Sequence, residues 1–207
     1  MPISNKEEIQ IVKGWWQKYG YYFLFIVIGF LVVNFGWRYW HRCNNANLES
    51  SSIIYTQMLT YLEQQKNAEF ELFGKRLIKD YPASSYASFA ALLLAKEAVQ
   101  QGNLRSALEM LQFVVKKAPI KKIRELARIR AARVLIAMKN PSEALVLLSN
   151  ADNKDYGAHV SEIFGDAYLA LGKVKNAEEA YRRAESLSKD KTLPLPLPLL
   201  KIKLQQF

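Results

Sequence analysis

The sequence has few of the residues that build disulfides and metal sites. It contains one cysteine, Cys43, and two histidines, His41 and His159. A single cysteine cannot form a disulfide within the chain, and these three residues together cannot supply the four ligands of a structural zinc site. A disulfide-rich secreted domain and a zinc fold are therefore excluded, and we expect neither a metal ion nor a cofactor.

Motifs for catalysis are also missing from the sequence. There is no glycine-rich phosphate loop, and the pairs Gly102-Asn103 and Gly172-Lys173 are typical of turns between helices. Neither histidine stands in a metal-ligand spacing or beside a plausible nucleophile. The sequence therefore predicts no catalytic residues and a protein that is not an enzyme.

Acidic residues are outnumbered, with 19 against 29 basic residues and a net charge of +10. Residues 1–42 hold five basic and two acidic residues, so the excess is spread over the whole chain. One dense cluster of basic residues lies within 116–133. A solvated helix face is the main interpretation of this cluster, and contact with an acidic protein or anionic lipid is the alternative. Nucleic acid is not expected, because no aromatic residue interleaves with these cations for base stacking. Glu125 is the only acidic residue within the cluster, which comprises Lys116, Lys117, Lys121, Lys122, Arg124, Arg128, Arg130 and Arg133.

Charge is absent from Tyr19 through Trp37, a run of 19 residues. As a helix this run reaches roughly 28 Å, which matches the ~30 Å hydrocarbon core of a bilayer. The sequence predicts a cytoplasmic segment over 1–18, a transmembrane helix over 19–40 and a linker over 41–47. Aromatic and basic residues at both ends are typical of membrane interfaces. The predicted interface anchors are Trp15, Trp16, Lys18, Trp37, Arg38 and Trp40.

A cleaved signal peptide does not fit this run, because it is too long and no small-residue cleavage site follows it. Lys6, Lys13 and Lys18 precede the run, whereas Arg38 and Arg42 follow it closely. The count of basic residues favours an N-terminus in the cytoplasm by a small margin.

The remainder of the chain shows a helical repeat. A small residue stands 12 positions before an alanine three times: Ala95 before Ala107, Ala132 before Ala144, and Gly165 before Ala177. The three alanines are 37 and 33 residues apart, which brackets the ~34-residue period of the tetratricopeptide repeat. We therefore predict an all-α, tetratricopeptide-like solenoid over 48–207. Its expected repeats are about 48–82, 85–119, 122–155 and 158–190, with a C-terminal capping helix within 194–207.

The first of these repeats is degenerate. Aligning Pro82 with Pro119 places Met58, Phe70 and Gly74 at the equivalent positions, with Phe70 where alanine is expected. A terminal repeat departs from the pattern because it has a neighbour on one side only. At the other end, the alternating prolines of 193–198 cannot lie inside a helix, so the capping helix is expected after them.

Most of the residues in these motifs are expected to pack in the core, so binding must use the surface. In a solenoid of helix pairs, the first helix of each pair usually lines the concave face. Helical position then gives ten candidate protein-binding residues, Tyr55, Leu59, Leu62, Phe89, Lys96, Ile129, Arg133, His159, Glu162 and Asp166.

The span closes in Gly36-Trp37-Arg38-Tyr39-Trp40, and the chain ends with Leu200-Lys201-Ile202-Lys203. With the repeats between them, these segments resemble the YfgM-like family of ancillary subunits of the bacterial SecYEG translocon. The resemblance implies a single-pass inner-membrane protein with its repeats in the periplasm. It also implies work beside the translocon and a PpiD-like membrane-anchored prolyl isomerase, passing exported client proteins to periplasmic chaperones. This chain departs from the family in being distinctly basic.

The alternative function is a scaffold on the cytoplasmic face of the membrane. Such a scaffold uses its repeat groove and basic surface to assemble a division, secretion or signalling complex. The side of the membrane on which the C-terminus lies distinguishes the two hypotheses. The oligomeric state is not predicted by either.

Overall fold

The computed structural model of the 207-residue chain describes residues 28–32, 34–35, 48–151, 153–188 and 197–205. The chain divides into two compact units, 1–49 and 50–207. The predicted transmembrane helix over 19–40 falls mostly outside the described residues, and all six predicted interface anchors do. Within the described ranges, no helix combines the length and the apolar composition that a membrane crossing requires.

The second unit consists of helices, and its described residues include no strand. A first helix covers 48–63. It is followed by α2 (Asn67–Asp80), α3 (Ser85–Gln100), α4 (Leu104–Lys117), α5 (Lys121–Ala137), α6 (Pro141–Ser149), α7 (Asn153–Ala170), α8 (Val174–Ser188) and α9 (Leu197–Leu204).

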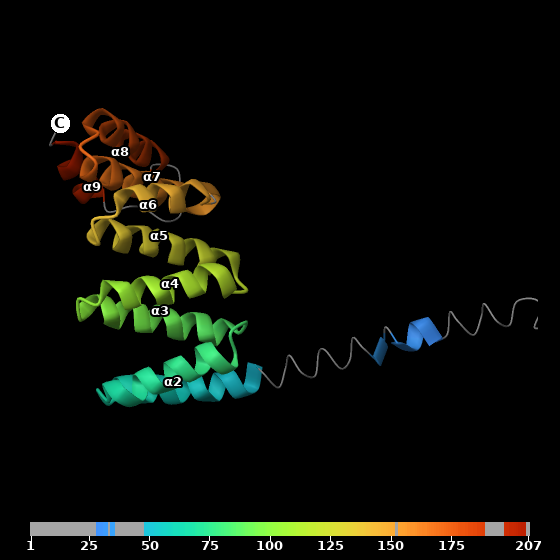
Figure 1. Ribbon diagram of the computed structural model, residues 1–207. Helices are drawn as coiled ribbons and strands as arrows, with labels where there is room; N and C mark the ends of the chain where they lie inside the picture. Colours follow the sequence, from blue (N-terminus) through green and yellow to red (C-terminus); the bar gives the residue numbers. More distant parts are fainter. Residues whose placement is uncertain (1–27, 33, 36–47, 152, 189–196, 206–207) are drawn as a thin grey trace, which may run out of the picture. The chain divides into compact units, whose positions relative to one another are not determined.

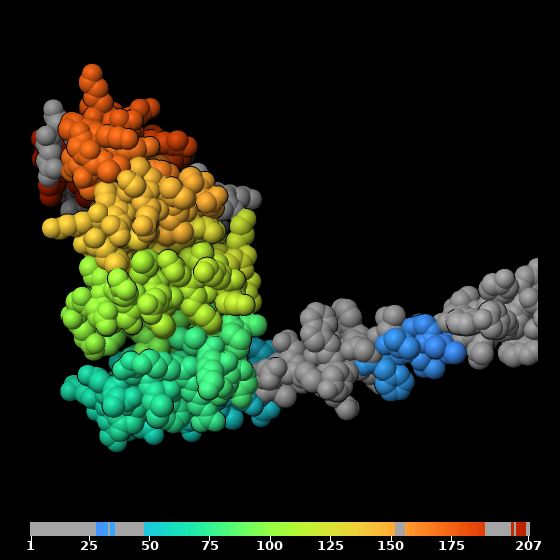
Figure 2. All heavy atoms as spheres, viewed as in Figure 1, coloured from blue at the N-terminus to red at the C-terminus, as the bar shows by residue number. Residues whose placement is uncertain are grey.

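The helices of this unit stack in the order of the sequence (Figure 1). Each helix from α2 to α9 packs against the next, and α5 also contacts α7. The space-filling view shows the same order, with successive repeats forming successive layers (Figure 2). An all-helical architecture of the tetratricopeptide-like repeat type is therefore confirmed for this unit.

The turns between paired helices repeat one backbone conformation. Each contains a residue in the left-handed region, with φ of 58° at Gln65, 76° at Gly102, 63° at Lys139 and 71° at Gly172. At the second of these turns the Gly102 N–H donates to the Val99 carbonyl, and the following N–H donates to Ala98. The same two hydrogen bonds recur, with shifted numbers, at the other three turns. This pattern satisfies the last carbonyls of the preceding helix and sends the chain back along it.

Side-chain size sets how closely the paired helices approach. Ala95 and Ala107 are buried in the second pair, as are Ala132 and Ala144 in the third. In the fourth pair, Gly165 lies directly against the ring of Tyr181, and a Cβ at position 165 would overlap that ring. Small residues on the first helix therefore make room for the second.

The first pair reverses these sizes. Met58 and Phe70 occupy the positions of the small residues, and both are buried. Gly74 occupies the position that holds Tyr181 in the fourth pair, and a Cβ there would lie 2.9 Å from Met58 Cε and 2.8 Å from Leu94 Cδ1. A large residue is therefore compensated by a glycine one helical turn away.

Candidate functional site

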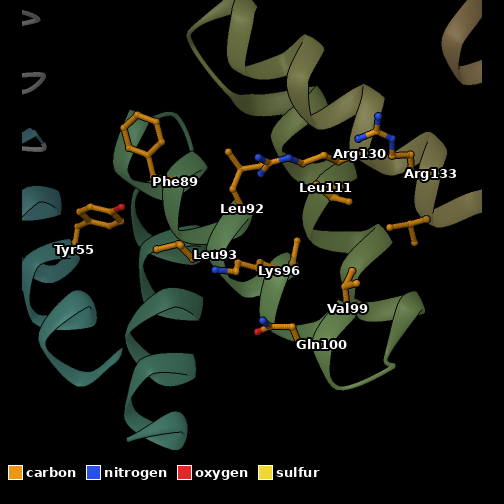
Figure 3. A pocket seen from close by; sticks show the side chains of 12 residues that line it. Tyr55, Phe89, Leu92, Leu93, Lys96, Val99, Gln100, Leu111, Arg130 and Arg133 are labelled. Carbon is orange, nitrogen blue, oxygen red and sulfur yellow. The ribbon is translucent and has the colours of Figure 1, made fainter. Parts of the chain in front are cut away.

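A groove of about 570 Å³ opens between helix 48–63, α3 and α5 (Figure 3). Its volume lies within the ~300–1,000 Å³ that is typical of ligand pockets. We call it the α3–α5 groove. Its lining residues are Tyr55, Phe89, Leu92, Leu93, Ala95, Lys96, Val99, Gln100, Leu111, Arg130, Arg133 and Val134.

Helix α3 provides most of this lining because of its periodicity. Leu92, Leu93 and Lys96 follow Phe89 by three, four and seven residues, so all four lie on one face of the helix. Tyr55 joins this face at one end, with its ring centroid 6.2 Å from that of Phe89. Burial raises the pKa of the Tyr55 hydroxyl, which therefore stays neutral at physiological pH. The groove thus has an apolar floor with an aromatic end.

Three cations stand on this apolar lining: Lys96 on α3 and Arg130 and Arg133 on α5. Lys96 and Arg130 are exposed, and no carboxylate of the described chain pairs with either of them. Arg133 is 49% exposed and donates from Nη2 to Glu162 Oε2 at 3.1 Å. The groove is therefore positively charged, and most of that charge is not neutralised within the domain.

A second polar cluster joins α7, α8 and α9. Lys203 of α9 donates to Glu162 Oε1 at 2.9 Å and to Asp166 Oδ1 at 2.7 Å. The Tyr181 hydroxyl donates to the same Asp166 oxygen at 2.6 Å. The Lys203 ammonium also lies 5.5 Å from the centroid of the Tyr181 ring. We call this group the α7–α9 ion cluster.

Partial burial and charge shift the proton affinities in and beside this cluster. Burial lowers the pKa of Lys203, but the hydrogen bonds and charges of Asp166 and Glu162 outweigh it, so the net pKa is raised above 10.5. Burial, with the hydrogen bond to Asp166, raises the pKa of Tyr181. The pKa of His159 lies below 6.5, because burial and the nearby Arg133 charge outweigh Glu162. At neutral pH the cluster therefore holds a charged lysine and a neutral tyrosine.

The structure divides the ten predicted binding residues into groups. Four of them, Tyr55, Phe89, Lys96 and Arg133, line the groove. Glu162 and Asp166 belong to the ion cluster, and Glu162 is only 4% exposed. The remaining half-buried positions are Leu59, Leu62 and His159, which do not line the groove.

Ile129 requires a correction. It was predicted on the concave face, but its side chain is 2% exposed and packs in the core with Ala132, Leu135 and Ile163. Its helix, α5, contacts α4, α6 and α7 and is therefore enclosed on more than one side. Helical position alone does not reveal that enclosure. Ile129 stabilises the repeat stack and offers no surface to a partner.

Several groove residues were not predicted from the sequence. Leu92, Leu93, Val99 and Gln100 continue the face of α3 that Phe89 and Lys96 begin. Extending the period of three or four residues from Phe89 identifies them, but their apolar character is equally typical of core positions. Arg130 was noted only as one member of the basic cluster.

The basic cluster itself separates into different roles. Arg124 Nη1 donates to the Ala118 carbonyl at 2.6 Å, which satisfies the C-terminal end of α4. Arg128 pairs with Glu125 at 2.6 Å, with side chains only 15% and 9% exposed. Arg130 and Arg133, in contrast, reach the groove. The cluster is therefore not one solvated face, because two of its arginines stabilise the fold.

The described residues contain no grouping of three or more histidine, cysteine, aspartate or glutamate side chains that could hold a metal ion. The α3–α5 groove instead has the chemistry of a binding surface. Hydrogen bonds, ion pairs and apolar contacts are what these side chains offer to a ligand.

Comparisons with known proteins agree with this description. A family model described as a tetratricopeptide repeat-like domain matches residues 13–207. A protein of Haemophilus influenzae is 24% identical over 88% of this chain and 89% of its own length. One of Escherichia coli is 24% identical over 86% and 85%, and one of Buchnera aphidicola from Acyrthosiphon pisum is 23% identical over 78% and 83%. All three are named ancillary SecYEG translocon subunit.

Proposed function

The chain belongs to the tetratricopeptide repeat-like domain family, and on that premise we propose that it is an ancillary subunit of the SecYEG translocon that binds other polypeptides in its α3–α5 groove. One observation carries the binding role, which is the open groove with its apolar floor and three cations. Repeat solenoids present extended binding surfaces because each helix pair contacts only its neighbours. The shared name of the three relatives supports the choice of the translocon as the assembly.

The proposal includes a membrane anchor over 19–40, with the N-terminus in the cytoplasm and the repeats in the periplasm. The uncharged run from Tyr19 to Trp37 supports it, and the family match begins before that run, at residue 13. An anchor of this kind holds the groove close to the channel exit and raises its effective concentration there. Weak contacts to exported clients, or to a PpiD-like prolyl isomerase, are then sufficient for handover to periplasmic chaperones.

Site-specific photo-crosslinking in cells tests the binding role. A photoreactive amino acid replaces Leu93 or Val99 in the groove, and the matched controls carry it at Leu72 or Val146. The control side chains are 64% and 67% exposed on α2 and α6 and do not line the groove. We expect adducts with translocon subunits, the isomerase or exported chains from the groove positions only. The absence of adducts from both groove positions, or equal yields from the controls, contradicts the proposal.

The topology has its own test. A reporter that is active only outside the cytoplasm is fused after Phe207, and one that is active only inside is fused at the same place. Activity of the first alone supports a periplasmic repeat domain. Activity of the second alone contradicts it and favours the cytoplasmic scaffold.

A further inference from the structure

The α7–α9 ion cluster and the α3–α5 groove differ in how their charges are compensated. In the α7–α9 ion cluster, the carboxylates of Glu162 and Asp166 receive the chain's own Lys203. In the α3–α5 groove, Lys96 and Arg130 receive no carboxylate from the described residues. The domain therefore supplies the cation for its acidic cluster, whereas among the three groove cations only Arg133 receives a carboxylate from the described residues, that of Glu162.

The basic groups are placed over the apolar floor. Figure 3 shows the Arg130 side chain extending from α5 toward Leu92, while Lys96 projects from α3 among the same lining residues. An anion bound by these groups lies beside the aliphatic side chains of Leu92 and Leu93. A ligand that matches this pattern must present a negative charge and an apolar side chain within a short length.

We propose that the occupant of the α3–α5 groove is an acidic, apolar segment of a partner polypeptide. Its aromatic or aliphatic side chain lies on the floor between Phe89 and Val99, and its carboxylates pair with Arg130 and Lys96, while Arg133 keeps its ion pair with Glu162 and adds positive charge at the rim. This inference rests on the proposed function and adds the chemical class of the bound segment. The apolar contact provides affinity, and the carboxylates provide selectivity, because a basic segment would meet like charges.

The shape of the site favours a polypeptide over the other anionic partners. The cations belong to a lined hollow of about 570 Å³, whereas adsorption to a lipid surface requires a broad exposed basic patch. The two aromatic residues of the groove, Tyr55 and Phe89, lie within 6.2 Å of each other at one end and do not alternate with the cations as base stacking requires. Arginine also binds carboxylates with two parallel hydrogen bonds, which suits Arg130.

The test uses the full-length protein in micelles of a detergent with an uncharged headgroup. A short fluorescent peptide in which leucine and phenylalanine alternate with glutamate is titrated, and its anisotropy gives the affinity. A second peptide has glutamine in place of every glutamate, and a third has lysine. The groove variant carries Lys96→Glu with Arg130→Glu, and the matched control carries Arg105→Glu with Lys175→Glu. Both control residues are exposed and lie outside the groove. Each variant replaces two basic residues by glutamate, so the two variants change the net charge equally.

We expect the glutamate peptide to bind the wild-type protein about tenfold or more tightly than the glutamine peptide, and the lysine peptide to bind most weakly. The groove variant should lose about tenfold or more in affinity for the glutamate peptide, and the control less than about threefold. Circular dichroism melting must give similar midpoints for both variants. The proposal is overturned if glutamate and glutamine peptides bind alike, if both variants lose affinity equally, or if anionic lipid vesicles displace the peptide while neutral vesicles do not.

The two proposals fail in different ways. Groove crosslinks to translocon components without any preference for acidic peptides would leave the proposed function standing and overturn the selectivity. Selective peptide binding without any cellular crosslink would preserve the acidic, apolar specificity and overturn the role at the translocon.

Discussion

The first and the last helix pairs solve the same packing problem with opposite choices of side chain. In the first pair, Met58 and Phe70 fill the space between the helices, and Gly74 leaves room for them. In the last pair, Gly165 opens a space that the ring of Tyr181 fills. The positions of large and small residues differ between the two pairs, but in each pair a glycine lies against a large side chain, as close packing requires.

The two pairs also differ in the side chains that the glycine faces. Gly74 faces the ends of flexible side chains, Met58 Cε and Leu94 Cδ1. Gly165 faces a ring whose hydroxyl is fixed by Asp166, which in turn is bound by Lys203. The comparison indicates that the last pair is the more rigid of the two, because a polar network holds its packing in place.

The largest expected effect comes from adding one methyl group to each glycine. Gly165→Ala should destabilise the domain by about 2–3 kcal/mol, because the new Cβ overlaps a ring that cannot move without breaking its hydrogen bond. Gly74→Ala should change stability by less than about 1 kcal/mol, because flexible side chains yield and alanine improves the helix. Urea denaturation followed by circular dichroism measures both. Equal losses would show that the two pairs do not differ in rigidity.

The next effect concerns the ion pairs. Lys203→Met leaves Asp166 without its counter-charge and Glu162 with Arg133 alone. The loss should be about 2 kcal/mol, below the value for a fully buried pair because Lys203 is 20% exposed. Lys96→Met is the matched control in the groove, and it should change stability by less than about 0.5 kcal/mol. Thermal or urea denaturation of both variants at neutral pH distinguishes these outcomes. If Lys203→Met leaves the free energy of unfolding unchanged, the ion cluster does not hold α9 in place.

The contribution of Lys203 should disappear in alkaline solution. Its pKa is raised in the folded state, so the folded protein holds the proton more tightly than the unfolded chain does. The stabilisation by Lys203 is therefore complete below pH 10.5 and is lost as the pH rises through the folded-state pKa. The difference in stability between the wild type and Lys203→Met should stay constant up to about pH 10 and shrink above it. A difference that grows with pH contradicts this assignment.

The smallest effect belongs to His159, which lies beside the ion cluster. Its pKa is lowered in the folded state, so the folded protein favours the neutral ring. The stability that the neutral ring contributes above pH 6.5 should be lost as the pH falls through the folded-state pKa of His159. The loss should be less than about 0.5 kcal/mol, because solvent screens a half-buried group. His159→Gln should remove this acid sensitivity. If the variant and the wild type lose stability in parallel between neutral and acid pH, His159 is not the source of the acid sensitivity.

Sequence reasoning recovered the repeat because its signal is local. The spacing from Ala95 to Ala107 depends only on helix geometry and a turn of fixed length, and the three later copies of that turn show both. The large side chain of Phe70 at a position where alanine is expected was also visible once the repeats were aligned. The compensation between Gly74 and Leu94 was not, because Leu94 belongs to the next pair and only the packing brings them together.

The candidate site was predicted less completely, for a physical reason. Helical position identifies a face, but it does not tell which part of the face a neighbouring helix covers. Ile129 and Lys96 both stood on predicted inner faces, yet one is buried in the core and the other is exposed in the groove. The contacts of Lys203 with residues 37 and 41 positions earlier likewise have no local signature.

The position of the groove within the sequence has a consequence for biosynthesis. Its last lining residue, Val134, precedes Lys203 by 69 residues in the chain. At roughly 5–20 residues per second, a ribosome adds these residues in about 3–14 s. During that interval every residue of the groove exists, while Glu162 and Asp166 are made before the lysine that neutralises them. The nascent chain therefore contains every residue of the basic groove before the lysine that pairs with Glu162 and Asp166 is made.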